Sequence, residues 1–474
     1  MQTLDTDWAV IPHNARKFDD KYLVTNLLGS FVFLSKDEYS QLTLSKLNKK
    51  SALFNRLYKA GIVLTDDNVA SAISDFRNSN LSLFHDPSLH IAVLTTRCNL
   101  ACKYCQTSNS KKSDMNKEVA SGILEYLTKV KYRPFVLEFQ GGEPLLNWEV
   151  LEFLVKGARK FIQDDNELVI SLVSNLILLD KEKTDFLVEH KVRICASLDG
   201  PQKLHDKNRV FLNNQGSYSK VVKGIKMIEA TYKKRKVESN TRLIPTITRH
   251  SLVFAREIID EYLKLKESVI YLKAIKQIGV ADKSWEELGY TPEEFIEFWK
   301  RAMDYIIELN KKGKDIQEWS SVLLLKKIMH KQDHGHVDMM NPCGAGRAVL
   351  TYMPDGNIYP CDEARMIKNS DLFVLGNVLR NRYEDIFKNE NLFAVCSASV
   401  MQLWDYASAY LPWKGTCPVL NYSSGNNLIP QIKTTPMDKI LEFQLDYLFS
   451  NLAKDGEVAA IFKRWLMKGG SIYA

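Results

Sequence analysis

The sequence predicts an α/β protein built around an open, partial (β/α)6 barrel. A small winged-helix-like domain precedes the barrel, and an irregular cysteine-bearing domain follows it. Between residues 86 and 275, short apolar runs alternate with helical patterns, which favours parallel strands joined by right-handed crossovers. The segment 1–85 contains a hairpin pattern with short helices. Residues 336–430 hold four of the eight cysteines and show little periodicity.

The composition limits the classes of protein to consider. Of the 474 residues, 45% are apolar and 10% aromatic, which is enough to bury large cores and excludes a mainly disordered chain. The net charge of +7 is small for this length, and no basic stripe typical of nucleic-acid binding stands out. The longest apolar run, 168–179, is too short to span a bilayer, and residues 1–17 show no secretory signal. We therefore expect a cytoplasmic protein without nucleic-acid or membrane partners, whose cysteines stay thiols unless they bind metal or do redox chemistry.

The N-terminal segment, 1–85, is expected to form the winged-helix-like domain. Residues 21–26 and 30–35 have the pattern of two strands in a hairpin. Ser35 followed by Glu38 predicts a capping box that opens a helix, and a second short helix should follow. The polar stretch 71–80 is predicted to be a linker to the barrel.

The barrel, residues 86–275, is expected to contain six strand–helix units. The expected strands are 90–95, 135–139, 168–173, 193–197, 241–246 and 269–273. The expected helices between them are 117–130, 148–162, 180–189, 219–232 and 252–264. In such folds ligands bind at the C-terminal ends of the strands, so the loops after the strands are the places to look for chemistry.

Two helical segments flank the irregular domain of residues 336–430. Residues 276–335 predict a helical linker, because Thr291-Pro292-Glu293-Glu294 combines a cap, a proline at the first helical position and acids in the first turn. Residues 431–474 predict a helical tail, with one or two amphipathic helices over 436–467.

The first cysteine motif follows the first expected barrel strand directly. Cys98, Cys102 and Cys105 have CxxxCxxC spacing on a loop at the ligand-binding end. Three thiolates on one tight loop suit three irons of a [4Fe–4S] cluster and leave the fourth iron open to a small molecule. Structural zinc takes four closed ligands, and three free core cysteines at this spacing would be a coincidence. The cluster is therefore the favoured interpretation.

A second motif closes the second expected strand at the same end of the barrel. Residues 140–144 read Gln-Gly-Gly-Glu-Pro. Glycines let the backbone approach a ligand closely, and their carbonyls can accept hydrogen bonds from an amine. Alone, this motif predicts only a turn, but after the cysteine motif it is specific.

Together, the two motifs resemble the radical S-adenosylmethionine (SAM) superfamily over roughly residues 88–275. In that superfamily the amino and carboxylate groups of SAM chelate the open iron, and one electron from the cluster cleaves SAM to a 5′-deoxyadenosyl radical. The cofactor carries the difficult chemistry and the protein positions it. The resemblance implies a radical SAM barrel with Cys98, Cys102 and Cys105 as the cluster ligands.

The resemblance also implies a set of residues that contact the cofactor. Gly141, Gly142 and Glu143 would lie beside the methionine amine, and the segment 197–209 looks like one shared by peptide-modifying members. The full implied set is Tyr104, Gly141, Gly142, Glu143, Pro144, Ser174, Asn175, Asp199 and Arg209. For Ser174, Asn175 and Arg209, strand-end caps and loop ion pairs are an equally good explanation.

The second cysteine set resembles the opening of the auxiliary iron–sulfur domain called SPASM, because Cys343, Gly356 and Cys361 have its spacing. A full SPASM domain has a later run of four cysteines. If Cys417 is the last of that run, the earlier positions are Trp404, Ala407 and Trp413, so the resemblance implies one auxiliary [4Fe–4S] cluster. Its ligands would be Cys343, Cys361, Cys417 and Cys396, with a buried free thiol as the alternative for Cys396. Cys195, inside an expected strand, should belong to the core.

Asp362 directly follows the expected cluster ligand Cys361. In some SPASM enzymes the acid at this place removes a proton from the substrate, and a carboxylate in a closed cavity can have its pKa raised for that task. A turn cap is the alternative role.

The chain as a whole resembles maturases of ribosomally made peptides, and specifically the maturase family of the His-Xaa-Ser peptide system. The similar pieces are residues 21–26, 31–35, 89–95, 105–106 and 417–422. The resemblance implies an oxidoreductase that modifies a precursor peptide, binds its leader by strand addition and takes electrons from flavodoxin or ferredoxin. The alternatives are a maturase of a folded protein, similar to sulfatase-maturing enzymes, a radical enzyme for a small molecule or RNA, and a non-catalytic cluster-bearing peptide-binding protein.

Overall fold

An eight-stranded sheet forms the centre of the computed structural model, which describes residues 7–81, 85–107, 112–162, 164, 166–331, 335–401, 407–429 and 435–467. The strand order is β10-β9-β8-β7-β6-β13-β14-β15. Strands β6 to β10 are parallel, as the alternation predicts, and β13 is parallel to β6. The strands are β6 (Leu89–Thr95), β7 (Phe135–Gly141), β8 (Leu168–Ser174), β9 (Arg193–Ser197), β10 (Thr241–Ile244), β13 (Val349–Tyr352), β14 (Asn357–Tyr359) and β15 (Gly376–Asn377).

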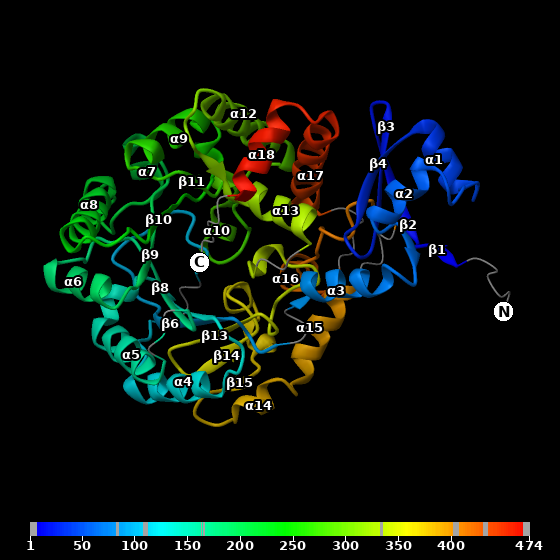
Figure 1. Cartoon of the computed structure of the whole chain (residues 1–474). Coiled ribbons are helices and arrows are strands. Elements are labelled where there is room, and N and C mark those ends of the chain that lie inside the picture. Colours follow the sequence, from blue (N-terminus) through cyan, green and yellow to red (C-terminus); the bar gives the residue numbers. More distant parts are fainter. Residues whose placement is uncertain are drawn as a thin grey trace.

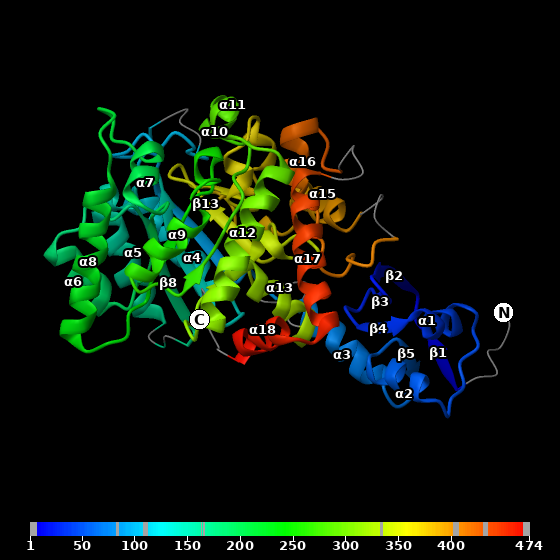
Figure 2. The same ribbon diagram turned by 90° about the horizontal axis from the view of Figure 1, so that it is seen from above.

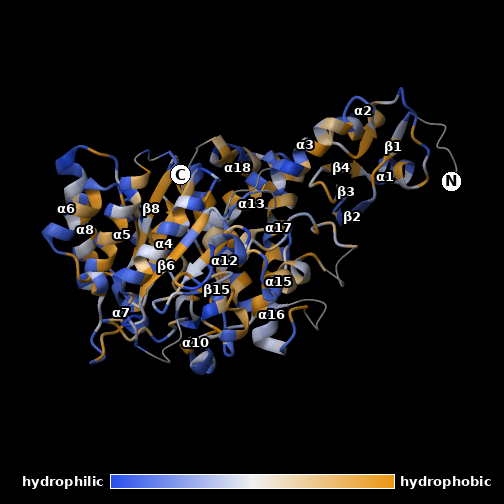
Figure 3. Cartoon of the chain, turned by 90° about the horizontal axis from the view of Figure 1, so that it is seen from below, coloured by the Kyte–Doolittle hydropathy of each residue, from blue (hydrophilic) through white to orange (hydrophobic). Residues whose placement is uncertain are grey.

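Helices cover the outer face of the barrel strands (Figure 1). These helices are α4 (Lys117–Lys129), α5 (Trp148–Phe161), α6 (Lys181–Glu189), α7 (Gln202–Asn208), α8 (Tyr218–Arg235) and α9 (Ala255–Lys264). Figure 3 shows hydrophobic colour concentrated on the central strands and hydrophilic colour on much of the surrounding helices. The α/β class and the partial barrel predicted from the sequence are therefore confirmed.

The central strand β6 separates two cores. All its residues are buried. Ala92 and Leu94 belong to the large core under the helices, whereas Ile91 and Val93 face a second core that contains Cys361 from the C-terminal segment. Because side chains alternate along a strand, one strand serves both layers. The C-terminal segment thus fills part of the barrel's inner face.

The sixth barrel strand differs from the expected 269–273. The short strand β11 (Val269–Ile270) pairs with β12 (Gln317–Glu318), while a single parallel bridge, Ile247 to Ala274, continues the sheet beyond β10. The buried Glu267 carboxylate accepts the backbone N–H of Leu243 at 3.2 Å. A side chain therefore occupies the edge of β10 on which a longer sixth strand would have paired.

The N-terminal residues form a unit to one side of the barrel (Figure 2). β2 (His13–Phe18), β3 (Lys21–Asn26) and β4 (Phe31–Ser35) make an antiparallel meander, and β1 (Trp8–Val10) pairs with β5 (Val63–Thr65). Its helices are α1 (Lys36–Thr43), α2 (Ala52–Lys59) and α3 (Val69–Ser79). The predicted hairpin is β3–β4, and the predicted Ser35–Glu38 capping box opens α1. The sequence did not show β2.

The stretch 71–80, expected to link the N-terminal unit to the barrel, belongs for the most part to helix α3. None of the α3 residues is buried, so its polar composition suits an exposed helix rather than a flexible connection. Lys331 fixes α3 to the main body, since its Nζ lies 2.7 Å from the Asp75 carboxylate and its carbonyl accepts from Ser79 Oγ at 2.8 Å.

Aromatic side chains join the N-terminal unit to the C-terminal segments. Phe31 lies with its ring centroid 5.4 Å from that of Phe449 and 6.4 Å from that of Trp413, and Thr25 Oγ1 donates to the Ala409 carbonyl at 2.7 Å. Trp413 is one of the positions where a full SPASM domain has a cysteine, and here it is a buried packing residue. Trp404 lies outside the described residues, and Ala407 is exposed.

The helices between 276 and 335 and after 435 lie in the segments expected to be helical, whereas α14, α15 and α16 lie in the segment 336–430 that was expected to be irregular. The capping box at Thr291 and the proline at the first position open α12, as predicted. None of the described helices is long and apolar enough to cross a membrane. The helices that follow the barrel are α10 (Val280–Lys283), α11 (Trp285–Leu288), α12 (Pro292–Lys311), α13 (Trp319–His330), α14 (Tyr383–Ile386), α15 (Glu390–Val400), α16 (Pro418–Gly425), α17 (Pro436–Lys454) and α18 (Glu457–Met467).

Candidate active site

The loop after β6 carries Cys98, Cys102 and Cys105 at the C-terminal end of the barrel strands, as the motif predicts. The loop is held along its length by backbone hydrogen bonds. Ala101 N donates to the Val210 carbonyl at 2.8 Å, Lys103 N to the Asn208 carbonyl at 3.0 Å and Ala281 N to the Cys105 carbonyl at 3.0 Å. A fixed backbone presents the three thiols in one arrangement, which is what a preformed metal site needs.

Gly141 and Gly142 pack directly against the cysteine loop. Gly142 N donates to the Thr95 carbonyl at 2.9 Å, and Glu143 N donates to the Arg97 carbonyl at 2.9 Å. A Cβ atom at Gly142 would overlap the backbone of Arg97, and one at Gly141 would overlap the carbonyl of Thr95. The two glycines are therefore required by the close approach of two backbones. That approach brings the QGGEP segment beside Cys98.

Glu143 ties the ends of β7 and β8 together. Its buried carboxylate accepts from Ser174 Oγ at 2.8 Å, Asn175 N at 2.9 Å and Leu145 N at 3.1 Å, next to Pro144, which begins a short 3-10 helix. Burial raises the pKa of Glu143, and the hydrogen bonds from Asn175 and Ser174 oppose that rise. Glu143 and Ser174 thus have structural partners inside the chain.

An orphaned amide lies beside the first cysteine. Asn175 Nδ2 donates to Asn99 Oδ1 at 2.8 Å, which links the end of β8 to the cysteine loop. The Nδ2 group of Asn99 is buried and has no hydrogen-bond partner among the described residues. An unsatisfied buried donor is unfavourable, so this group suits a site that an acceptor on a ligand completes.

A buried ionic network under the loop connects it to the end of β9. Asp199 is completely buried and accepts from Tyr104 Oη at 2.8 Å, Arg209 Nε at 3.0 Å and Asn208 Nδ2 at 3.1 Å. The Arg209 guanidinium also lies over the Tyr104 ring, 5.1 Å from its centroid. Burial lowers the pKa of Arg209, but the charge of Asp199 more than offsets this and raises it well above its usual value. The loop is therefore anchored through its own residue Tyr104 to the buried pair of Asp199 and Arg209.

The donor set of the loop fits an iron–sulfur cluster better than a single ion. Burial raises the pKa of Cys98 to about 11 and that of Cys102 to about 12, and the charges of neighbouring loop thiols add to both. Yet no three His, Cys, Asp or Glu side chains in the described part of the chain converge as ligands of one metal ion. In a cluster each thiolate binds its own iron, and metal binding displaces the thiol protons.

Three cysteines of the second set lie in the C-terminal segment that packs on the inner face of the barrel. Cys361 follows β14, Cys343 precedes β13 and Cys417 caps α16, and all three belong to one apolar cluster. Burial raises the pKa of Cys361, and the charges of Cys417 and Cys343 contribute. Cys396 lies on α15, packs against the other core and points its Sγ at the Ala345 carbonyl, 3.8 Å away. A fourth-ligand role for Cys396 stays a prediction.

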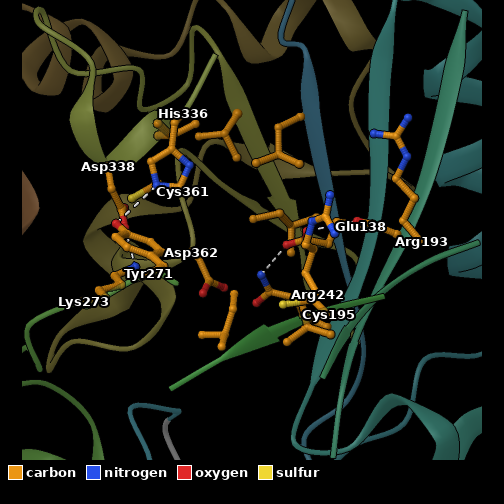
Figure 4. Close-up of a pocket in the computed structure, with 18 of the residues that line it drawn as sticks. Glu138, Arg193, Cys195, Arg242, Tyr271, Lys273, His336, Asp338, Cys361 and Asp362 are labelled. Atoms are coloured by element: carbon orange, nitrogen blue, oxygen red, sulfur yellow. Dashed lines mark hydrogen bonds and ion pairs between the residues drawn. The ribbon is translucent and has the colours of Figure 1, made fainter. Parts of the chain in front are cut away.

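A cavity of about 230 Å³ lies between the inner face of the barrel strands and the second cysteine set (Figure 4). Cys195 on β9 lines this cavity, so its expected place in the core is wrong. The polar and charged lining residues are Glu138, Gln140, Ser171, Arg193, Asn240, Arg242, Tyr271, Lys273, His336, Asp338, Asp362 and Glu363. Sequence reasoning missed Glu138, although a glutamate alternating with apolar residues in a buried strand is a readable signal.

Asp362 reaches the cavity from the turn after β14. Its side chain does not cap the following 3-10 helix; instead its Oδ1 accepts from Arg365 Nε at 2.8 Å, so it is not a turn cap. Burial raises the pKa of Asp362, and the charge of Arg365 opposes the rise. Arg365 Nη2 also lies 3.5 Å from Gln140 Oε1, which connects this acid to β7.

A second charged group lies between the cavity and the second cysteine set. Lys276 Nζ lies 2.5 Å from the Glu363 carboxylate and 3.4 Å from that of Asp338, and Lys273 also pairs with Asp338. Burial lowers the pKa of Lys276, but the negative charges of Asp338 and Glu363 more than offset this and raise it well above its usual value. Sequence reasoning did not identify this cluster, because its members come from segments that are far apart along the chain.

Comparison with known proteins agrees with this geometry. Residues 92–259 match the family model of the radical SAM superfamily. The chain is 28% identical over 323 residues to a cysteine-type anaerobic sulfatase-maturating enzyme of Clostridium perfringens, covering 64% of this chain and 81% of that one. It is 23% identical over 311 residues to the mycofactocin maturase MftC of Mycobacterium ulcerans, covering 63% of this chain and 74% of that one.

Two solved structures share the fold. Native anSMEcpe with bound AdoMet and Kp18Cys peptide superimposes with a TM-score of 0.65 at 19% identity, covering 80% of this chain and 100% of that one. Streptococcus suis SuiB bound to the precursor peptide SuiA superimposes with a TM-score of 0.54 at 14% identity, covering 91% of this chain and 98% of that one.

Proposed function

Because the chain carries a radical SAM domain and is a radical SAM enzyme that uses a [4Fe–4S] cluster and SAM, we propose that it modifies a ribosomally made precursor peptide. The observation that carries this proposal is the cavity on the inner face of the barrel strands, with Cys361 of the second cysteine set and Asp362 in its wall. A cavity of about 230 Å³ encloses one amino-acid side chain, and a polypeptide can place such a side chain there.

The loop residues have distinct tasks in this proposal. Cys98, Cys102 and Cys105 would hold the SAM-binding cluster, and Gly141 and Gly142 would lie against the amino group of SAM. When bound, the cluster and SAM supply a 5′-deoxyadenosyl radical that takes a hydrogen atom from the substrate. The loop is anchored by the bonds among Tyr104, Asp199 and Arg209. The turn beside it is fixed by Glu143, Pro144, Ser174 and Asn175.

Asp362 serves as the proton acceptor in this proposal. Forming a crosslink after hydrogen abstraction requires the loss of one more electron and one proton. Asp362 lines the cavity with 23% of its side chain exposed, so its carboxylate is accessible to a bound side chain. Burial raises the pKa of this carboxyl, which makes it a stronger base once ionised.

Cys343, Cys361 and Cys417 would hold an auxiliary [4Fe–4S] cluster that takes the electron. Their shared apolar cluster and mutual electrostatic influence support one site for all three. Cys396 is the candidate fourth ligand on the chain. Flavodoxin or ferredoxin is the proposed source of the electron that starts the reaction.

The N-terminal unit is the proposed binding site for the leader of the peptide. The three-stranded sheet β2-β3-β4 has two edge strands, and an extended peptide adds to such an edge through backbone hydrogen bonds. Helix α3 exposes Val69, Ile73 and Phe76, which follow helical spacing along one stripe. An exposed apolar stripe of this kind is typical of a binding surface.

A maturase of a folded protein is the second candidate function. The 28% identity to a sulfatase-maturating enzyme supports it. The likeness to SuiB spans 91% of this chain, against 80% for anSMEcpe, and this wider span supports the peptide maturase.

Co-expression with each small open reading frame beside the gene, followed by mass spectrometry, tests the proposed function. We expect one encoded peptide to lose the mass of two hydrogens in the presence of the wild-type chain and to keep its mass with the Cys98→Ala variant. If every peptide keeps its mass and shows no deuterium uptake, whereas a co-expressed sulfatase is oxidised, the second candidate replaces the first.

A further inference from the structure

One carboxylate in the cavity forms no ion pair within the described part of the chain. Glu138 projects from the middle of β7 into the cavity and is 6% exposed. Gln140 Nε2 donates to its Oε1 at 2.7 Å, and Ser171 Oγ donates to its Oε2 at 2.9 Å. Among the described residues no Lys, Arg or His forms an ion pair with it. Because both partners donate, they suit the ionised form of Glu138.

The other carboxylates that line the cavity have partners of opposite sign within the chain. Arg193, which lies two strands from Glu138 in the same row of the sheet, forms no ion pair with it. The ion pairs around the cavity are Lys273 with Asp338, Lys276 with Glu363, Arg365 with Asp362 and Arg242 with Glu267. Glu138 is therefore the one carboxylate lining the cavity that has no ion pair among the described residues.

The position of Glu138 suits a long cationic side chain. Glu138 on β7 lies four residues before Gly142, which follows the strand, and this corresponds to roughly 13 Å along an extended chain. Gln140, which holds Glu138, also accepts from Arg365, and Arg365 bonds Asp362, so the acid is fixed relative to the proposed base. A side chain that reaches Glu138 with its charged end leaves its methylene carbons between Glu138 and the cysteine-loop end of the barrel.

We propose that Glu138 selects the substrate residue by pairing with a Lys or Arg side chain inside the cavity. This inference rests on the function proposed above. A buried carboxylate without a counter-ion is unfavourable, whereas a hydrogen-bonded pair with a cation satisfies it. Burial raises the pKa of Glu138 and the charge of Asp362 adds to this rise, whereas the hydrogen bonds from Gln140 and Ser171 and the charge of Lys273 oppose it. A bound cation would oppose it further. An uncharged side chain of the same length gains none of this.

Calorimetric titration of the cluster-loaded chain with short peptides tests the proposal. The probes are acetylated, amidated pentapeptides Ala-Ala-X-Ala-Ala in which X is lysine, arginine, norleucine or glutamate, added in the presence of SAM. We expect the lysine and arginine peptides to bind the wild-type chain at least about tenfold more tightly than the norleucine peptide, and the glutamate peptide to bind most weakly.

The Glu138→Gln variant keeps the size of the side chain and removes its charge. With this variant the lysine and norleucine peptides should bind alike, whereas the matched control Glu152→Gln, on the outer face of α5, should keep the wild-type preference. Iron content equal to wild type shows that the variants are folded. If Glu138→Gln does not fold, the wild-type comparison stands alone.

The outcomes separate this inference from the proposed function. Equal binding of the lysine and norleucine peptides to the wild-type chain, or no binding of either, overturns the selection by Glu138. Side-chain-deuterated probes report the proposed function independently, because hydrogen abstraction transfers deuterium to 5′-deoxyadenosine. Deuterium transfer without charge preference leaves the proposed function standing and removes the role of Glu138.

Discussion

Replacing Asp199 with asparagine should detach the support of the cysteine loop. Asp199 is completely buried and bonds Tyr104, Arg209 and Asn208, and it also accepts from Thr246 N at 3.2 Å. Asparagine has nearly the same shape but carries no charge. The change therefore leaves the Arg209 guanidinium, which is 8% exposed, without a counter-ion in the interior.

The expected loss of stability follows from that unpaired charge. Removing one partner of a buried ion pair costs about 3–5 kcal/mol. At about 2–4 °C per kcal/mol for domains of this size, the unfolding midpoint should fall by roughly 6–20 °C. The control Glu152→Gln breaks the exposed pair with Lys156, which has a length of 2.6 Å, and should lower stability by only about 0.3–0.5 kcal/mol.

Differential scanning calorimetry under anaerobic conditions measures both midpoints, and iron analysis reports whether the loop still holds its cluster. We expect Asp199→Asn to unfold well below the control and to retain less iron. If the midpoint of Asp199→Asn equals that of Glu152→Gln, the network does not hold the loop, and Asp199 must be explained by contact with the cofactor instead.

Three further predictions concern pH, catalysis and peptide binding. Burial lowers the pKa of His90 from 6.5 to about 4, so the contribution of neutral His90 to stability is complete above pH 6.5 and is lost as the pH falls through about 4. The stability of His90→Gln, measured by acid unfolding with circular dichroism, should therefore depend less on pH in this range than that of the wild-type chain. An unchanged pH dependence would contradict this. Asp362→Asn should keep its iron and slow product formation per 5′-deoxyadenosine by about 100-fold or more, whereas an equal ratio and rate would leave the base unidentified. Ile73→Glu on α3 should weaken turnover of a full-length precursor but not SAM cleavage without peptide; unchanged turnover would exclude α3 from leader binding.

Local signals in the sequence were sufficient for the barrel and its cysteine loop. Strand β9 has the expected bounds, and α4 and α6 differ by one residue at one end, because apolar periodicity and capping residues lie within each element. The CxxxCxxC and QGGEP motifs come together because both follow parallel strands at the same edge. Gly142 could be read from the sequence since its chemistry, the absence of a Cβ, is local.

Features that depend on distant segments could not be read in this way. Nothing near Val349 shows that β13 pairs with β6, which lies much earlier in the chain, because the partner supplies the register. Glu138 faces a cavity whose other wall comes from residues 336–363, so the fold alone gives that residue its importance. Trp413 likewise gained its buried place from Phe31 and Phe449 in other parts of the chain.

The central claim is that the chain holds two iron–sulfur sites, one in each cysteine set, and the iron content of anaerobically reconstituted protein tests it most directly. We predict about eight irons in the wild-type chain, about four after joint replacement of Cys98, Cys102 and Cys105 by alanine, and about four after joint replacement of Cys343, Cys361 and Cys417. About four irons in the wild-type chain, with almost none after the first replacement, would contradict the second site.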